Sequence, residues 1–232
     1  MGCKRPWVQV PLARPVKTIL KEIVFFVCCQ KVGFSGKVVL LMKLIFATHN
    51  PGKIKEMQEL LAGSGIEVLS ADEAGVNEDV VEDGLTFEEN ALKKARFVCK
   101  KTGECAVADD SGICINALNG APGVFTARWA GEGNDLIDFT LNQIKDIVEE
   151  NLGAQFRCFV ALVKPDGQEF LFEGRSNGRL IKERRGTAHP KLPYDQIFIP
   201  EGHIQTFAEM SHEEKHELSH RGQAFKKLKD FF

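Results

Sequence analysis

The chain has 232 residues, of which 44% are hydrophobic, and 30 basic against 32 acidic side chains give a formal net charge of −2. This is the composition of a globular protein that is long enough to bury a core. The near-neutral charge argues against a general nucleic-acid coat or a membrane-surface binder, because both carry a basic excess. The seven cysteines include no C-x-x-C pair, which favours reduced thiols in a cytoplasmic protein over a disulfide framework or a zinc site.

No apolar run reaches the roughly 18 residues that span a bilayer, so we expect no membrane segment. The basic residues are unevenly spread, since residues 1–41 hold seven of them and only one acid. At Met42 the pattern changes to a buried strand followed by a helix start. We therefore expect the working domain to span residues 42–232. Residues 1–41 would be an appended basic arm, or an upstream translation of a gene whose start is Met42.

From Met42 onward the pattern alternates between strands and helices. Asn50-Pro51 is a typical helix entry with proline at the first helical position, and Thr86 has capping-box spacing to Glu89. The expected elements, in chain order, are a strand at 43–47, helices beginning at 51 and 87, strands at 105–108 and 113–115, a helix at 136–152, a hairpin of strands at 156–163 and 169–175, an extended segment at 197–199, and helices at 211–218 and 219–232. This order predicts an α/β protein with a mixed sheet.

Polar and basic side chains gather where the first strand ends and the first helix begins, in Thr48-His49-Asn50-Pro51-Gly52-Lys53. A helix N-terminus offers free backbone N–H groups and the positive end of the helix dipole, which together favour an anion. Thr48 and Asn50 add side-chain donors, and Lys53 adds a full positive charge. The competing interpretation is an ordinary helix cap with a solvated lysine. The chain contains no G-x-x-x-x-G-K-[ST] loop.

Two adjacent carboxylates, Asp109 and Asp110, follow a buried-looking strand and precede Ser111-Gly112, and Glu82 precedes the helix before that strand. Carboxylates at the exit of a strand can hold Mg²⁺ through their oxygen atoms. Because adjacent residues of an extended chain point to opposite sides, we expect Asp109 and Asp110 to have different roles. The competing interpretation is a turn rich in Asp, Ser and Gly.

The last helix begins with Ser219-His220-Arg221, and Lys215 precedes it. Ser219 can cap this helix, which places His220 and Arg221 in its first turn. Cationic groups there oppose the helix dipole, so an anionic or strongly accepting ligand would explain their position. The alternative is a surface His-Arg pair without a partner. The histidines lack the spacing of a zinc site, and we expect none.

These three groups and two further motifs occur in the order seen in one enzyme family. The motifs are Thr48-x-Asn50-x-x-Lys53, Glu82-x-Gly84-x-Thr86-Phe87-x-x-Asn90-Ala91, Ala108-Asp109-Asp110-Ser111-Gly112, Gly120-Ala121-Pro122-Gly123 with Ala127-Arg128-Trp129, and Ser219-His220-Arg221. From Met42 to the C-terminus the chain therefore resembles the inosine triphosphate pyrophosphatases, which are cytoplasmic enzymes that remove ITP, dITP and XTP from the nucleotide pool. The resemblance does not include residues 1–41.

The resemblance implies a fold, a reaction and a cofactor. The fold would be a long central mixed β-sheet flanked by helices, with two lobes and an active-site cleft between them, usually in a homodimer. The reaction would be the Mg²⁺-dependent attack of water on the α-phosphate of a nucleoside triphosphate, which gives the monophosphate and pyrophosphate. The substrate would be this small molecule, with no nucleic acid or membrane as a partner.

The resemblance also implies a role for each matching residue. Lys53 and Asp110 would be catalytic, with Asp110 as general base or metal ligand, and Glu82 would help to hold Mg²⁺. Arg221 and His220 would read the base. The other residues implied to bind substrate are Thr48, His49, Asn50, Pro51, Gly52 and Ser111 near the phosphates, Lys215 near the phosphates or the base, and Leu192, Pro193, Tyr194 and Asp195 in the base pocket.

The chain departs from the family pattern in the expected base pocket. Where the family has Gly-Phe-Gly-Tyr/Trp-Asp-Pro-x-Phe, this chain has a longer loop that ends in Leu192-Pro193-Tyr194-Asp195-Gln196-Ile197-Phe198. Leu192 stands in the place of the aromatic residue that stacks on the purine. Stacking contributes about 1–3 kcal/mol per base in proteins that bind nucleic acids. We therefore expect the base preference to be altered more than the activity.

Two other functions remain open from the sequence. A pyrophosphatase of the Maf type, similar in fold, would act on pyrimidine or modified nucleotides. The Ser-His-Arg motif argues against it, whereas the altered pocket keeps it open. A nucleotide sensor without catalytic activity is the other alternative, but a sensor has no need of a water-activating carboxylate such as Asp110.

Overall fold

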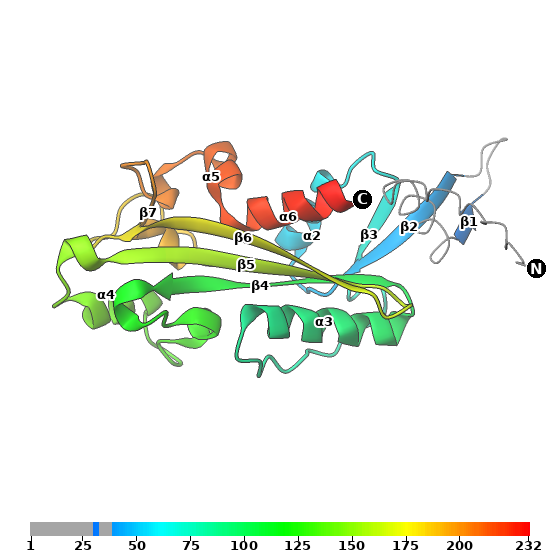
Figure 1. Ribbon diagram of the computed structural model, residues 1–232, viewed down its shortest axis with the longest axis horizontal. Coiled ribbons are helices and arrows are strands. Elements are labelled where there is room, and N and C mark those ends of the chain that lie inside the picture. The colour runs from blue at the N-terminus through cyan, green and yellow to red at the C-terminus, as the bar shows by residue number, and fades with distance from the viewer. Residues whose placement is uncertain (1–29, 33–38) are drawn as a thin grey trace, which may run out of the picture.

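The computed structural model describes residues 30–32 and 39–232 (Figure 1). Within them, seven strands form one sheet in the order β1-β2-β4-β5-β6-β7, with β3 paired to β2. β2 runs parallel to β3 and β4, and the other neighbours are antiparallel. The strands are β1 (Gln30–Val32), β2 (Val39–Phe46), β3 (Ile66–Ser70), β4 (Cys105–Ile115), β5 (Gly153–Val163), β6 (Glu169–Leu180) and β7 (Phe198–Pro200).

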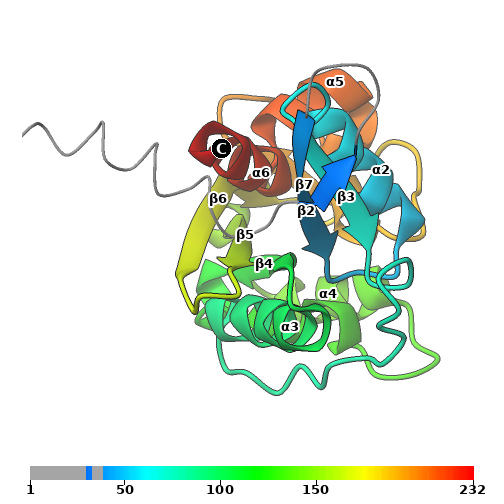
Figure 2. The ribbon, with the colours of Figure 1, turned by 90° about the vertical axis from the view of Figure 1, so that its right-hand side faces the viewer.

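Helices cover both faces of this sheet. Strands β4, β5 and β6 run along the length of the molecule, with α3 on one face and α2 and α6 on the other (Figures 1 and 2). No helix in the described part of the chain is long and apolar enough to cross a membrane. The α-helices are α2 (Pro51–Leu60), α3 (Phe87–Thr102), α4 (Leu136–Ile144), α5 (His212–Leu218) and α6 (His220–Phe231). The predicted α/β class is confirmed, whereas the two lobes and the cleft between them stay a prediction.

The alternation of side chains along the strands divides the core between the two faces. On the face of α2 and α6, the buried cluster includes Phe46, Val107 and Phe225. On the face of α3, it includes Ala91 and Ala108. A third buried cluster, around α4 and β7, fills the far end of the long strands. Buried side chains thus pack against both faces of the sheet, and the side chains of its strands are fixed in position by this packing.

The predicted helix starts at Thr86 and Ser219 are confirmed. Thr86 Oγ1 accepts a hydrogen bond from the N–H of Glu89 at 3.2 Å, and Ser219 Oγ accepts one from the first turn of α6 at 3.0 Å. The reciprocal half of the capping box differs, because the carboxylate of Glu89 accepts from the N–H of Leu85 at 2.7 Å instead of from Thr86. α3 ends at Gly103, whose φ of 69° is the left-handed conformation that favours glycine.

The prediction of two separate strands at 105–108 and 113–115 was wrong. β4 is one continuous strand, and β5 pairs with it residue by residue from Ala106 to Ile115. The Asp-Ser-Gly sequence is typical of a turn, but here a glycine is needed at position 112 because neighbouring atoms leave no space for a side chain. A Cβ at this position would lie 2.3 Å from Thr126 Oγ1 and 2.6 Å from the C=O of Gly123. The glycine therefore lets the segment after β4 pack closely against the strand.

The predicted helix at 136–152 is also shorter than expected. α4 ends at Ile144, and a single turn of 3-10 helix, η3 (Glu149–Asn151), follows. The C=O of Leu152 accepts a hydrogen bond from the N–H of Leu180 in β6 at 2.8 Å. This bond joins Leu152 to the sheet, and β5 begins at the next residue, Gly153, so the helix does not continue to 152. β3, which pairs with β2, was not predicted at all.

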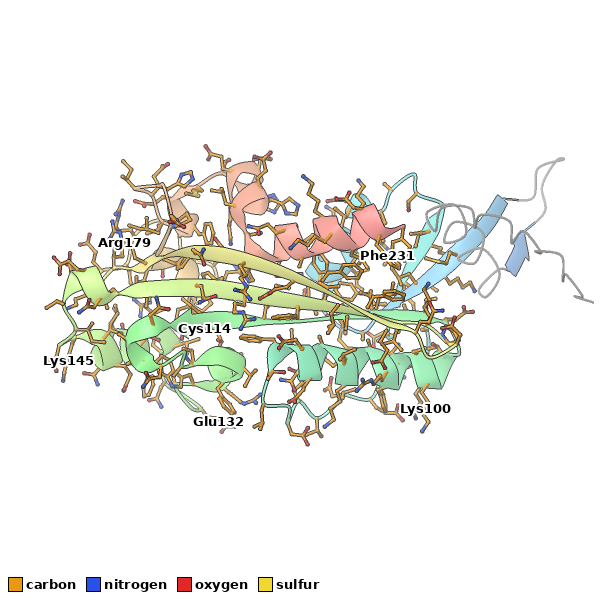
Figure 3. All side chains as sticks on the ribbon, in the orientation of Figure 1. Lys100, Cys114, Glu132, Lys145, Arg179 and Phe231 are labelled. Carbon is orange, nitrogen blue, oxygen red and sulfur yellow. The ribbon has the colours of Figure 1, made fainter. Side chains whose placement is uncertain are left out.

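The stretch of β6 that precedes its pairing with β7 has no neighbouring strand on its outer edge among the described residues. Side chains of α6 cover this edge instead. Gln223 Oε1 accepts from the N–H of Arg175 at 3.4 Å, and Lys227 Nζ donates to the C=O of Glu173 at 2.6 Å. At the end of the helix, the ring of Phe231 packs against aromatic side chains of β6 (Figure 3).

The start of the described sheet lies close to the expected domain boundary. β2 begins at Val39, ahead of Met42, and its first residues pair with β1. β3 and β4 pair with β2 from Met42 and Leu44 onward. Most of residues 1–41 lie outside the described residues. The separation of a basic arm from a domain at 42–232 therefore stays a prediction.

Candidate active site

The predicted site residues come together where β2 ends beside β4. β2 stops at Phe46 and pairs with β4 as far as Val107, whereas β4 continues to Ile115 against β5. The N–H of Ala47 donates to the C=O of Val107 at 2.8 Å and closes the contact between the two strands. Beyond it, one edge of β4 faces the loops that follow β2 and β3. The carboxyl ends of parallel strands are the usual place for ligands in α/β proteins.

Asp109 and Asp110 lie in the middle of β4 and point to opposite faces of the sheet, as predicted. Asp109 is only 3% exposed and contacts basic side chains of α2 and α6. Asp110 contacts polar side chains of α3. Ser111 is half-buried and, by alternation, shares the face of Asp109. The two neighbouring carboxylates therefore belong to two different sets of contacts.

The loop after β2 turns into α2 as the sequence predicts. Asn50 is the N-cap, its Oδ1 accepts from the N–H of Gly52 at 3.0 Å, and Pro51 is the first helical residue. Thr48 Oγ1 accepts from the N–H of Asn50 at 3.2 Å. The side chains of Thr48 and Asn50 thus shape the turn. Because Pro51 has no N–H and the N–H groups of Gly52 and Ile54 donate to Asn50, the backbone N–H and the ammonium group of Lys53 are the donors that this turn can offer an anion.

Lys53 and Arg221 meet on the buried carboxylate of Asp109. Lys53 Nζ lies 2.9 Å from both Asp109 oxygens, and Arg221 Nε lies 3.5 Å from Oδ2. Arg221 Nη2 also lies 3.2 Å from Glu56 Oε2. Burial alone would raise the pKa of Asp109, but the charges of Lys53 and Arg221 outweigh it and hold that pKa well below its usual range. An ionised Asp109 therefore keeps both cations in one place.

His220 is half-buried, with its Nδ1 atom inaccessible to solvent, and its ring is neutral, which corrects the expectation of a cationic side chain at the start of α6. Burial and the neighbouring charge of Arg221 lower its pKa to about 3. Its ring stacks on Phe156, with ring centroids 4.8 Å apart and planes 9° from parallel. His220 Nδ1 and the Nε and Nη2 atoms of Arg221 are buried without an aligned hydrogen bond within the described residues, although the Arg221 atoms make the ion pairs given above.

A second lysine, Lys94 of α3, joins the two carboxylates that the resemblance assigns to a metal. Lys94 Nζ lies 3.1 Å from Glu82 Oε1 and 3.7 Å from Asp110 Oδ1. Lys94 is not among the site residues predicted from the sequence. The available signal is its spacing, because it lies one helical turn after Asn90, a residue of the quoted motif, and so shares its side of α3. Glu56, which contacts Arg221, was also missed, and no motif points to it.

Glu82 and Asp110 fit a magnesium ion. Both reach the same ammonium group, so a single cation can lie between them. Carboxylate oxygens are the ligands that Mg²⁺ prefers. The described residues contain no group of three or more His, Cys, Asp or Glu side chains that could hold a metal ion. Mg²⁺ would therefore take its other ligands from water and from the phosphates of a substrate, as this ion usually does.

The surroundings of Asp110 suit a general base. Burial raises the pKa of this carboxyl, and the charge of Lys94 and a 3.1 Å hydrogen bond from Asn90 Nδ2 only partly oppose the effect. A carboxylate with a raised pKa accepts a proton more readily than a freely solvated one. Asp110 is thus better suited to proton transfer than Asp109, whose pKa is lowered.

A pocket of about 240 Å³ opens between the loops after β2 and β3 and helix α3. His49 stands at its wall, where Nδ1 lies 2.7 Å from Asp72 Oδ1 and Nε2 lies 3.6 Å from Asp79 Oδ1. Asp110 and Ser111 are not part of the wall, and Lys94 connects Asp110 to it. The predicted or newly found site residues that line the pocket are Thr48, His49, Lys53, Glu82, Lys94 and Asp109.

The segment expected to hold the base contains a short 3-10 helix, η4 (Pro193–Gln196). Leu192, just before it, is 39% exposed, whereas Tyr194 is 3% exposed. Tyr194 Oη lies 3.0 Å from Thr140 Oγ1, and burial raises the pKa of this phenol to about 12. The Tyr194 ring packs edge-on against Phe156. Leu192 is therefore available to a ligand, and Tyr194 belongs to the core beneath it.

Asp195 and Lys215 form an ion pair in the same region. Burial raises the pKa of Asp195, although Lys215 opposes the effect. Lys215 Nζ lies 5.8 Å from the ring centroid of Phe207, and that centroid lies 6.1 Å from that of Phe156, on which His220 stacks. Lys215 and His220 thus border the same aromatic cluster. Of the predicted base-binding residues, Asp195, Lys215, His220 and the buried ring of Tyr194 meet around this cluster, whereas Arg221 lies against Asp109 and Glu56.

Comparisons with known proteins agree with this picture. The model of one family, described as the Ham1 family, matches residues 44–231. A protein of Streptomyces coelicolor named dITP/XTP pyrophosphatase is 47% identical over 193 residues, which cover 81% of this chain and 96% of that protein. A protein of Bacillus subtilis with the same name is 42% identical over 194 residues, which cover 82% of this chain and 97% of that protein.

Solved structures show the same relationship. A HAM1 protein from Coxiella burnetii superimposes with a TM-score of 0.77 at 37% identity, and covers 82% of this chain and 98% of that chain. A nucleoside-triphosphatase, dITP/XTP pyrophosphatase, from Mycobacterium abscessus superimposes with a TM-score of 0.70 at 43% identity, and covers 81% of this chain and 98% of that chain.

Proposed function

Because the chain belongs to the Ham1 family, we propose that it hydrolyses the non-standard purine nucleoside triphosphates ITP, dITP and XTP to the monophosphate and pyrophosphate. The observation that carries this proposal is the meeting of two charged groups at the end of β2. Lys53 and Arg221 converge on Asp109, and Glu82 and Asp110 converge on Lys94. A highly anionic substrate needs cations, and hydrolysis needs a carboxylate that can take a proton from water.

The phosphates would bind at the start of α2. The backbone N–H of Lys53 and the positive end of the helix dipole attract an anion, and Lys53 lines the adjacent pocket. Mg²⁺, held by Glu82 and Asp110, would neutralise part of the charge on the phosphates and orient them. The pairing of Lys53 with Asp109 keeps the ammonium group in front of this pocket before a substrate arrives.

Asp110 is the residue that we assign to proton transfer. Its carboxylate takes a proton from the attacking water while the oxygen of that water bonds to the α-phosphorus. The bond between the α-phosphorus and the bridging oxygen breaks, and pyrophosphate leaves with the electron pair. The proton on Asp110 then returns to solvent. The position of Asp110 supports this assignment, because its carboxylate lies beside Lys94 and Glu82, where a water bound with the substrate would be within reach.

The base would be read at the start of α6. The neutral ring of His220 and the charged guanidinium of Arg221 both carry buried polar atoms without aligned hydrogen-bond partners. Such atoms cost free energy until a ligand pairs with them. The 6-oxo group of hypoxanthine or xanthine is an acceptor for such donors. A 6-amino purine would leave them unpaired, so the site would discriminate against ATP. Leu192, exposed and aliphatic, replaces an aromatic stacking contact in this proposal.

We also propose that the enzyme works in the cytoplasm, with Mg²⁺, as a homodimer. The thiols of Cys114 and Cys158, which are free in the described part of the chain, are compatible with a reducing compartment. The homodimer rests on the family resemblance alone. Size-exclusion chromatography with light scattering tests it, because a mass near 26 kDa would contradict it and one near twice the 25.8 kDa of the chain would support it.

A turnover assay tests the function. The purified full chain is incubated with ITP, XTP, GTP, dUTP and TTP, with and without Mg²⁺, and the released pyrophosphate is measured. We expect turnover of ITP and XTP to exceed that of the other nucleotides and to require Mg²⁺. Preference for dUTP or TTP would instead favour a Maf-type enzyme. Binding of ITP without turnover would favour a sensor.

A further inference from the structure

The amide side chain of Asn90 connects the loop before α3 to the acidic centre of β4. Asn90 lies in the first turn of α3 and is 1% exposed. Its Oδ1 accepts from the N–H of Gly84 at 2.8 Å, and its Nδ2 donates to Asp110 Oδ2 at 3.1 Å. Gly84 lies two residues after Glu82. One buried amide thus touches the segments that carry both proposed metal ligands.

The partners of Asn90 fix which end of its amide faces Asp110. A backbone N–H can only donate, so the amide oxygen must face Gly84. The amide nitrogen must then face Asp110. The reversed amide would set two donors against each other at Gly84 and an oxygen against the carboxylate, and both contacts would leave buried polar groups unsatisfied. Asn90 can therefore present only a hydrogen-bond donor to Asp110.

Gly84 makes this close approach possible. A Cβ at residue 84 would lie 2.5 Å from Asn90 Oδ1 and 2.9 Å from Glu89 Cβ. Real Cβ atoms do not come this close to their neighbours, so any larger residue would push the loop or the amide away. The glycine and the asparagine of the motif thus form one unit with the carboxylate of Asp110.

We propose that Asn90 is a positioning residue that gives the two oxygens of Asp110 different tasks. The bond to Asn90 engages Oδ2, and Oδ1 remains on the side of Lys94 and Glu82. Oδ1 is then the oxygen presented to the cation and to the attacking water. Because the same amide holds Gly84, the orientation of Asp110 is coupled to the loop that carries Glu82. This inference rests on the proposed function for its catalytic part, and on geometry alone for the orientation.

Asn90→Asp is the most direct variant, because it keeps the size of the side chain and the acceptor for Gly84 but removes the donor to Asp110. We expect kcat for ITP to fall about 10- to 100-fold, since small displacements of a reacting group have effects of this size. KM should change less than threefold, because the Asn90 side chain is 1% exposed and its amide bonds to Gly84 and Asp110. Asn142→Asp, the same change on the exposed surface of α4, is the matched control and should behave as the wild type.

A purely structural role of Asn90 makes different predictions. An Asn90→Asp variant that keeps kcat within twofold of the wild type would overturn the positioning role. The reciprocal double variant, Asn90→Asp with Asp110→Asn, restores an amide–carboxylate pair in the opposite sense. It should recover the melting temperature that Asn90→Asp loses, yet stay as inactive as Asp110→Asn. Recovery of activity in this double variant would also overturn the proposal.

Crystal structures separate this inference from the proposed function. In Asn90→Asp, which keeps the size and the acceptor for Gly84 but has no donor, we expect the Asp110 carboxylate to leave the rotamer that it has in the wild type or to occupy two rotamers. An unchanged, single rotamer would refute the orienting role even if the enzyme is active. If the wild-type protein hydrolyses none of the nucleotides tested, the function fails, and the rotamer measurement still decides the role of Asn90.

Discussion

The pairing of Lys53 with Asp109 gives the sharpest test of the charge arrangement at the site. Lys53→Met keeps most of the length of the side chain and removes its charge. Asp109 would then stay buried with Arg221 as its remaining close cation, at 3.5 Å instead of 2.9 Å. Because Asp109 cannot move to solvent from the middle of β4, the cost of its buried charge should appear directly in the free energy of unfolding.

The size of the effect follows from the burial of the pair. Removal of one partner from a buried ion pair costs about 3–5 kcal/mol. The Lys53 side chain is 29% exposed and Arg221 stays nearby, so we expect the low end, about 3 kcal/mol. At roughly 2–4 °C per kcal/mol for a chain of this size, the melting temperature should fall by roughly 6–12 °C at pH 7. Turnover of ITP should fall at the same time, because the lysine would bind phosphate.

The loss should depend on pH in a defined direction. The folded protein holds the pKa of Asp109 below its unfolded value, so this carboxylate stabilises the fold above the unfolded pKa, which is about 4. That contribution is lost as the pH falls from about 4 through the lowered folded pKa. The difference in melting temperature between the wild type and Lys53→Met should therefore be largest at neutral pH and shrink in acid.

Two further variants decide whether this reasoning holds. Lys53→Met combined with Asp109→Asn removes the buried charge together with its partner and should recover at least half of the lost stability, but no activity. Lys55→Met is the matched control, because that side chain is 78% exposed and pairs loosely with Glu59 at 3.8 Å, and its melting temperature should stay close to that of the wild type. A single Lys53→Met variant as stable as the wild type would refute the argument.

Three other predictions concern the reaction, the boundary of the domain and the base pocket. Asp110→Asn should lower ITP turnover at least ~10²-fold, the lower end for loss of a proton acceptor, and circular dichroism should show it folded; near-normal turnover would remove Asp110 from its role. A chain that begins at Met42 keeps every pairing of β2 with β3 and β4, so it should fold and hydrolyse ITP at the rate of the full chain, and loss of solubility would show that residues 1–41 complete the core. Leu192→Phe should lower KM for ITP with kcat little changed, because stacking binds substrate and transition state alike; an unchanged KM with a lower melting temperature, from overpacking of about 1–3 kcal/mol, would remove Leu192 from the pocket.

The parts of the fold that local chemistry determines could be predicted from the sequence. The cap at Asn50, the proline that follows it, and the caps at Thr86 and Ser219 each act within a few residues. The alternation of a strand was enough to separate Asp109 from Asp110. These features depend on neighbours along the chain, so the sequence alone contains the information that sets them.

The features that were missed depend on partners far away in the sequence. Gly112 lies inside a strand, where the close approach of Thr126 leaves no room for a Cβ atom. No local sequence pattern distinguishes such a glycine from one in a turn. Lys94 reaches two carboxylates on separate segments. The neutral state of His220 arises from burial against Phe156, which only the packed structure shows. Charge state and strand continuity were therefore beyond sequence reasoning here.

The way in which α6 covers the outer edge of β6 has a consequence for aggregation. An uncovered strand edge can recruit a strand of another molecule, which is a common route to aggregates. Gln223 and Lys227 occupy the hydrogen-bonding groups of Arg175 and Glu173 that such a strand would use. Fraying or proteolysis of α6 would therefore expose unpaired backbone groups on the edge of β6. The last helix thus covers an edge that could otherwise pair with a strand of another molecule, in addition to carrying His220 and Arg221.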